Sequence, residues 1–87
     1  MKNVKGLVLS INGLTAKLST QIVAEANKYK SNCIICVDDE EADLKSIMNV
    51  MALVVPRGHE FTIKIEGEDE DKAAEGFNKL LPEINLQ

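Results

Sequence analysis

Leu44-Lys45-Ser46-Ile47-Met48-Asn49-Val50-Met51-Ala52-Leu53 is the stretch that tells most about the fold of this chain. A serine precedes apolar residues at helical spacing, which predicts a short helix with Ser46 as its N-cap. One face of this helix is expected to enter the core and consists of Val50, Leu53 and Val54. A neighbouring face is expected to remain partly exposed and consists of Ile47, Met48 and Met51. Methionine adapts to irregular partners, so this second face suits the docking of another protein.

The segments that flank this helix alternate between strand and helix patterns. Upstream, Val4–Ile11 predicts a strand that ends at Asn12-Gly13, and Cys33–Val37 predicts a second strand. Between them lies a helix with Thr15 as N-cap, whose apolar face consists of Leu18, Ile22, Ala26 and Tyr29. Downstream, Glu60–Glu66 alternates between polar and apolar residues, as a half-buried strand does. Asp69 is expected to cap a last helix, whose apolar stripe consists of Ala73, Phe77, Leu80, Leu81 and Ile84.

The acidic run Asp38–Asp43 lies directly before the Ser46 segment. It fits a solvated hairpin turn or a short edge strand. A calcium-binding loop is the alternative, but the run lacks the glycine and the final carboxylate of an EF-hand loop. The order of elements is therefore β, α, β, short β, short α, β, α. Amphipathic helices can cover the buried face of a sheet, so we expect an α+β sandwich with one layer of helices on an antiparallel sheet.

Length and charge limit the classes of function. Eighty-seven residues suffice for a single domain over residues 1–87 with one core, which must be aliphatic because only three residues are aromatic. The net charge of −4 argues against direct binding to nucleic acid. The longest apolar run is too short to span a membrane, and the first residues do not resemble a signal peptide. We therefore expect a cytoplasmic protein.

The two cysteines, Cys33 and Cys36, form a C-x-x-C pattern, which suggests a redox pair or half a zinc site. However, residues three apart on a strand point to opposite faces, and the single histidine, His59, is far away in sequence. We therefore expect two buried structural thiols, no metal site and no cofactor.

Three motifs resemble one family over essentially the whole chain. The most specific is the Leu44–Met48 and Val50–Leu53 pattern, followed by Gly13-Leu14 before a helix with Ala16 and Thr20, and by Gly67–Glu70 before the last helix. Together they resemble the histidine-containing phosphocarrier protein, HPr, of the bacterial sugar phosphotransferase system. The resemblance implies an open-faced β-sandwich, with four antiparallel strands covered on one face by three helices. It also implies that the protein is not an enzyme.

The active-centre segment departs from the family pattern. The family has histidine, arginine and proline where this chain has Thr15, Lys17 and Leu18. A phosphothreonine ester is far too stable to pass its phosphoryl group on readily, so we expect no catalytic residue and no phosphotransfer from phosphoenolpyruvate. Thr15 either serves only as a helix cap, or remains with Lys17 as a contact for an anion or a partner.

The regulatory segment keeps its serine. The resemblance to catabolite-repression HPr-like proteins implies that Ser46 is phosphorylated by an HPr kinase/phosphorylase. The protein would then bind a transcription regulator of the catabolite control type through Ile47, Met48 and Met51. Two departures bear on this: Asn49 replaces a usual glycine, and acidic residues replace frequent lysines upstream.

Two alternatives remain open. The chain can be an interaction module that is never phosphorylated and binds a partner through the same apolar face. It can also be a phosphocarrier with another acceptor, for which His59 is the only histidine.

Overall fold

The computed structural model describes residues 1–84 and 86. Within them the elements are β1 (Lys2–Leu7), α1 (Ala16–Ala26), β2 (Asn32–Val37), β3 (Glu40–Asp43), α2 (Ile47–Met51), β4 (Glu60–Glu66) and α3 (Glu70–Glu83). This order is the predicted one, including the short strand in the acidic run.

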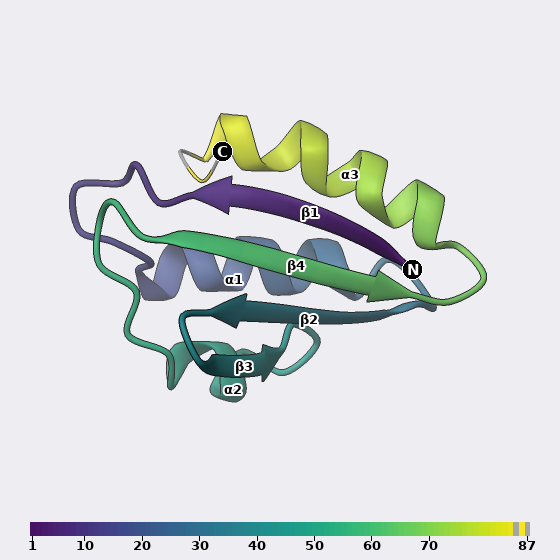
Figure 1. Cartoon of the computed structure of the whole chain (residues 1–87), viewed down its shortest axis with the longest axis horizontal. Helices are drawn as coiled ribbons and strands as arrows, with labels where there is room; N and C mark the ends of the chain where they lie inside the picture. The colour runs from purple at the N-terminus through teal and green to yellow at the C-terminus, as the bar shows by residue number, and fades with distance from the viewer. Residues whose placement is uncertain (85, 87) are drawn as a thin grey trace.

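The four strands form one antiparallel sheet in the order β1-β4-β2-β3. The central strand β4 places Ile63 opposite Val4 of β1 and opposite Ile35 of β2. Figure 1 shows α1 and α2 behind the strands and α3 along β1, with the near face of the strands left open. The predicted α+β open-faced sandwich is therefore confirmed.

The core lies between the sheet and the helices. The alternation predicted for β4 is present, since Phe61, Ile63 and Ile65 are buried while Glu60, Lys64 and Glu66 are exposed. From the helices, the largest buried side chains are Ile22, Phe77 and Leu81. Apolar burial on one face and polar residues on the other are what an antiparallel sheet with one solvated face requires.

Three boundary predictions were wrong. Tyr29 was expected on the first helix, but α1 ends at Ala26 and Tyr29 lies in the turn that follows. The first strand ends at Leu7 rather than at Ile11, because its partner β4 begins at Glu60, opposite Leu7. Leu9 and Ile11 lie beyond the sheet and are exposed. Val54 was expected in the core but is 86% exposed, because α2 ends at Met51 and the helical spacing no longer applies to residue 54.

The two cysteines lie on opposite faces of β2, as predicted, and neither forms a disulfide. Cys33 is buried, but Cys36 is half-buried on the open face, so the expectation of two buried thiols was wrong for Cys36. Burial is the main cause that raises the pKa of each thiol. At Cys36 a contact of 3.3 Å between Sγ and Glu41 Oε2 raises the pKa further.

Asp69 precedes α3 but does not cap it through its side chain. Its carboxylate instead accepts hydrogen bonds from Lys30 N and Ser31 N, both at 2.9 Å, and from Ser31 Oγ. The bond from Ser31 Oγ is the main reason that the pKa of Asp69 falls from its ordinary value of 3.8 to about 2. Asp69 therefore joins the start of α3 to the segment before β2.

Candidate functional site

The start of α1 is fixed by Thr15, whose Oγ1 accepts a hydrogen bond from Leu18 N at 3.2 Å. The predicted N-cap is therefore confirmed. Before it, Gly13 has a φ of +73°, and Leu14 N donates to Val55 O at 2.9 Å. A side chain at Gly13 would overlap Val55 O. The turn before α1 is thus packed directly against the segment that follows α2.

Thr15 and Lys17 lie together at a shallow hollow of about 430 Å³. Its other lining residues are Ser10, Asn12, Leu18, Gln21, Glu83 and Ile84. The polar groups among them are hydroxyls, amides, one ammonium and one carboxylate. A hollow with this lining can hold a polar group by hydrogen bonds, but its two opposite charges give it no net preference for an anion. Sequence reasoning missed Glu83, because it comes from the end of α3.

The start of α2 is fixed by Ser46, which is the predicted N-cap. Its Oγ accepts a bond from Asn49 N at 3.4 Å and a second from the Asn49 side-chain Nδ2 at 2.7 Å. This side-chain contact was not predicted, since the sequence marked Asn49 only as a departure from glycine. Beside it, Met48 is 80% and Met51 is 53% exposed, and Ile47 is half-buried. The prediction of a partly exposed apolar face on α2 is confirmed.

The charged side chains near Ser46 are hydrogen-bonded to backbone groups. Asp43 Oδ1 accepts a hydrogen bond from Lys45 N at 2.9 Å, which places this carboxylate in the turn that leads to Ser46. Lys45 Nζ donates to Tyr29 O at 2.7 Å, and Asn27 Nδ2 approaches Lys45 O at 3.5 Å. The lysine adjacent to Ser46 is therefore held against the end of α1.

These contacts place Ser46 at the C-terminal end of α1, whereas Thr15 is at its N-terminal end. Eleven helical residues separate the two ends by about 16 Å. The structure therefore does not combine Thr15 and Ser46 in one site. Thr15 and Ser46 therefore lie at two separate positions on the surface. The helices that begin at them, α1 and α2, pack against each other.

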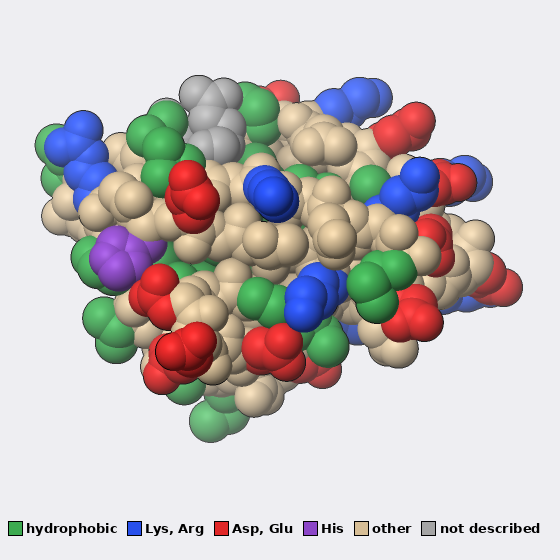
Figure 2. Space-filling model, viewed as in Figure 1, with side chains coloured by type: hydrophobic (Ala, Val, Ile, Leu, Met, Phe, Trp, Pro, Cys, Tyr) green, Lys and Arg blue, Asp and Glu red, His purple; other side chains and the backbone are tan. Residues whose placement is uncertain are grey.

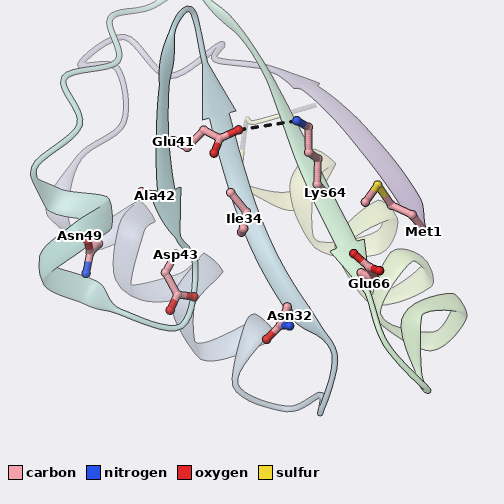
Figure 3. Close-up of a pocket in the computed structure, with 9 residues that line it drawn as sticks. All are labelled: Met1, Asn32, Ile34, Glu41, Ala42, Asp43, Asn49, Lys64 and Glu66. Carbon is pink, nitrogen blue, oxygen red and sulfur yellow. Dashed lines mark ion pairs between the residues drawn. The ribbon is translucent and has the colours of Figure 1, made fainter.

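The open face of the sheet carries a second hollow, of about 390 Å³ (Figure 3). Lys64 and Glu41 form an ion pair of 3.6 Å across it, with Ile34 between them and Asn49 at its rim. Figure 2 shows acidic side chains gathered over the β2–β3 hairpin on the same face. Of the predicted site residues, this hollow includes none.

His59 lies at the opposite end of the hairpin, with Nδ1 3.3 Å from Asp38 Oδ2. Across residues 1–84 and 86, no three His, Cys, Asp or Glu side chains are grouped so that they could hold a metal ion. No helix in that part of the chain is long and apolar enough to cross a membrane.

Comparison with known proteins identifies the family. Residues 5–83 match the family model described as the PTS HPr component phosphorylation site. The phosphocarrier protein HPr of Lysinibacillus sphaericus is 38% identical over 99% of this chain and 98% of its own length. The HPr-like protein Crh of Bacillus subtilis is 40% identical over 72% of this chain and 74% of its own.

A solved structure agrees with these relatives. The fold matches a histidine-containing phosphocarrier protein from Mycoplasma with a TM-score of 0.91 at 31% identity, over 99% of both chains. This chain therefore belongs to the HPr family of the bacterial phosphotransferase system, a family of phosphocarriers and HPr-like proteins that are not enzymes.

Proposed function

We propose that this chain is a regulatory member of the HPr family, a single cytoplasmic domain of residues 1–87. An ATP-dependent HPr kinase/phosphorylase modifies it on Ser46, and the modified form binds a transcription regulator of the catabolite control type. It does not carry phosphoryl groups from phosphoenolpyruvate. The observation that carries this proposal is the position of Ser46, at the start of α2 and beside the exposed Met48 and Met51.

The residue at position 15 argues against phosphotransfer. A phosphohistidine passes its phosphoryl group on because its P–N bond is labile, whereas a threonine ester is stable. Thr15 Oγ1 already accepts the bond from Leu18 N that begins α1. Activation of a hydroxyl nucleophile also needs a general base. The only histidine, His59, has its Nδ1 beside Asp38 Oδ2 and is not among the residues that line the hollow at Thr15.

The geometry at Ser46 favours a phosphoryl group. Phosphorylation adds about −1.5 to −2 charges at pH 7, and the start of a helix stabilises negative charge. Because Ser46 is the N-cap, the added group would lie beside backbone N–H groups of α2 without requiring the helix to move. A partner protein would therefore recognise the phosphorylated form by its changed surface charge next to an apolar face.

That face supplies the partner contact. Ile47, Met48 and Met51 present flexible apolar side chains, which suit an irregular protein surface. The Crh relative supports the assignment, since its structure is described as a catabolite repression protein. Thr15 and Lys17 form the second polar contact, at the other end of α1.

Two other functions are less well supported. A phosphocarrier that uses His59 would place a phosphoryl group beside Asp38 and Glu60, where like charges repel it. An interaction module without phosphorylation would use the same α2 face, and differs only in that Ser46 stays unmodified.

The test is intact-mass spectrometry after incubation with ATP and an HPr kinase. The wild type is expected to gain the mass of one phosphoryl group, and Ser46→Ala is expected to gain none. Binding of the phosphorylated protein to a catabolite control regulator is then measured with Met48→Asp as the interface variant. Failure of the wild type to gain mass would overturn the proposal and leave the two other functions.

A further inference from the structure

We propose that Asn49 acts as a brake on the phosphorylation of Ser46. This inference rests on the proposed function and concerns the regulation of the same site. Its basis is the hydrogen bond of 2.7 Å that the Asn49 side-chain amide donates to Ser46 Oγ.

A serine hydroxyl has two lone pairs and one proton. In this chain Asn49 contacts both lone pairs, because its backbone N also donates to Ser46 Oγ, at 3.4 Å. The backbone bond is the ordinary N-cap bond. The side-chain bond is the shorter of the two and is additional to it. A glycine at position 49 could make the first bond but not the second.

Phosphorylation needs one of these lone pairs. The Oγ–P bond forms as the bond between the γ-phosphorus of ATP and its leaving oxygen breaks, releasing ADP. The hydroxyl proton passes to the catalytic base of the kinase. A lone pair that accepts a hydrogen bond from the Asn49 amide must be released before it can attack phosphorus. The amide therefore stabilises the unmodified serine relative to the transition state, which lowers the rate of the chemical step.

The backbone position of Asn49 keeps its exposed side-chain amide within reach of Ser46 Oγ. Asn49 is on the first turn of a helix whose next residue, Val50, is completely buried. Asn49 also lies at the rim of the open-face hollow, near Asp43 (Figure 3). The lysine beside Ser46 is turned toward Tyr29, so it does not compete for the serine oxygen.

The test compares steady-state phosphorylation of the wild type, Asn49→Ala and Asn49→Gly by ATP and an HPr kinase. Removal of one hydrogen bond predicts an increase in kcat of about threefold to tenfold, with KM for the protein unchanged. Asn27→Ala is the matched control, because this asparagine contacts the same segment through Lys45 O and does not contact Ser46. It is expected to keep the wild-type kcat.

A second measurement tests the contact itself without any kinase. In Ser46→Ala the side-chain amide of Asn49 loses its acceptor, so its ¹⁵N-edited NMR signals are expected to shift and its hydrogens to exchange faster with water. Unchanged signals would overturn the proposal, because the bond would then be absent in solution.

The kinetic outcomes separate the two proposals. Faster modification of Asn49→Ala supports the brake. Equal kcat for wild type and variant overturns the brake but leaves the phosphorylation of Ser46 in place. A lower KM without any change in kcat has the same consequence, because it would indicate a steric effect on docking. If neither protein is phosphorylated, both proposals fail.

Discussion

Gly76→Ala tests how closely α3 approaches α1. An alanine Cβ at this position would overlap Tyr29 Oη and Glu25 Oε2. These two atoms form a hydrogen bond of 2.7 Å, and Lys28 Nζ donates to Glu25 Oε1 at 2.9 Å. Burial by itself would raise the pKa of Glu25, but the bonds from Tyr29 and Lys28 hold it below its ordinary value. The bond to Glu25 is also the main cause that raises the pKa of Tyr29 to about 12.

Two effects oppose each other in this variant. Replacing glycine by alanine inside a helix stabilises a protein by about 1 kcal/mol. Displacing the tyrosine hydroxyl from the carboxylate removes a hydrogen bond to a charged group, which contributes about 1.5 to 3 kcal/mol. The cost of losing this hydrogen bond exceeds the gain from helix propensity. We therefore expect a net loss of about 0.5 to 2 kcal/mol in the free energy of unfolding.

The assay is urea unfolding followed by circular dichroism. Asn78→Ala is the control, because Asn78 is exposed on the same helix. This variant measures the gain in stability from helix propensity without any overlap. Tyr29→Phe combined with Gly76→Ala is expected to lose less than the sum of the two single variants, since both remove the same bond. A Gly76→Ala protein as stable as Asn78→Ala would refute the close approach.

Three further predictions concern the N-cap of α1, the stability of the protein in acid and the reactivity of the two thiols. Thr15→Ala should lower the free energy of unfolding by about 0.5 to 2 kcal/mol in thermal melts, while Thr15→Ser retains the cap and most of the stability. Asp69 has a pKa lowered from 3.8 to about 2 on folding, so its stabilising contribution is complete above pH 3.8 and is lost as the pH falls toward 2. Consequently the stability difference between wild type and Asp69→Asn should shrink over that window in acid titrations, and a constant difference would contradict the assignment. Thiol labelling of the folded protein should modify Cys36 and spare Cys33, which should react only in denaturant.

The sequence predicted those elements whose pattern is local. The alternation in Glu60–Glu66 followed from one buried face, and both N-caps, Thr15 and Ser46, followed from a hydroxyl placed before a helical run. Periodicity failed where an element ended early. Val54 lies outside the helical repeat because α2 stops at Met51, so its spacing no longer determines its burial.

Contacts between distant segments could not be predicted in this way. Asp69 has the residue type and position of a helix cap, yet its carboxylate binds the backbone before β2, which only the folded arrangement brings near. The same holds for Glu83, which joins Thr15 and Lys17 at one hollow from the far end of the chain. The Asn49 contact with Ser46 is local, and the S-x-x-N spacing at a helix start could have indicated it.

The central claim is that this member of the HPr family is switched through Ser46 and does not relay phosphoryl groups. The most direct measurement treats one sample with phosphoenolpyruvate and enzyme I, and another with ATP and HPr kinase, with an intact HPr as the positive control for both. The phosphorylated residue is then mapped, and its stability in acid is measured. We predict an acid-stable phosphate on Ser46 from ATP alone. An acid-labile phosphate on any residue of this chain after treatment with phosphoenolpyruvate would contradict the claim.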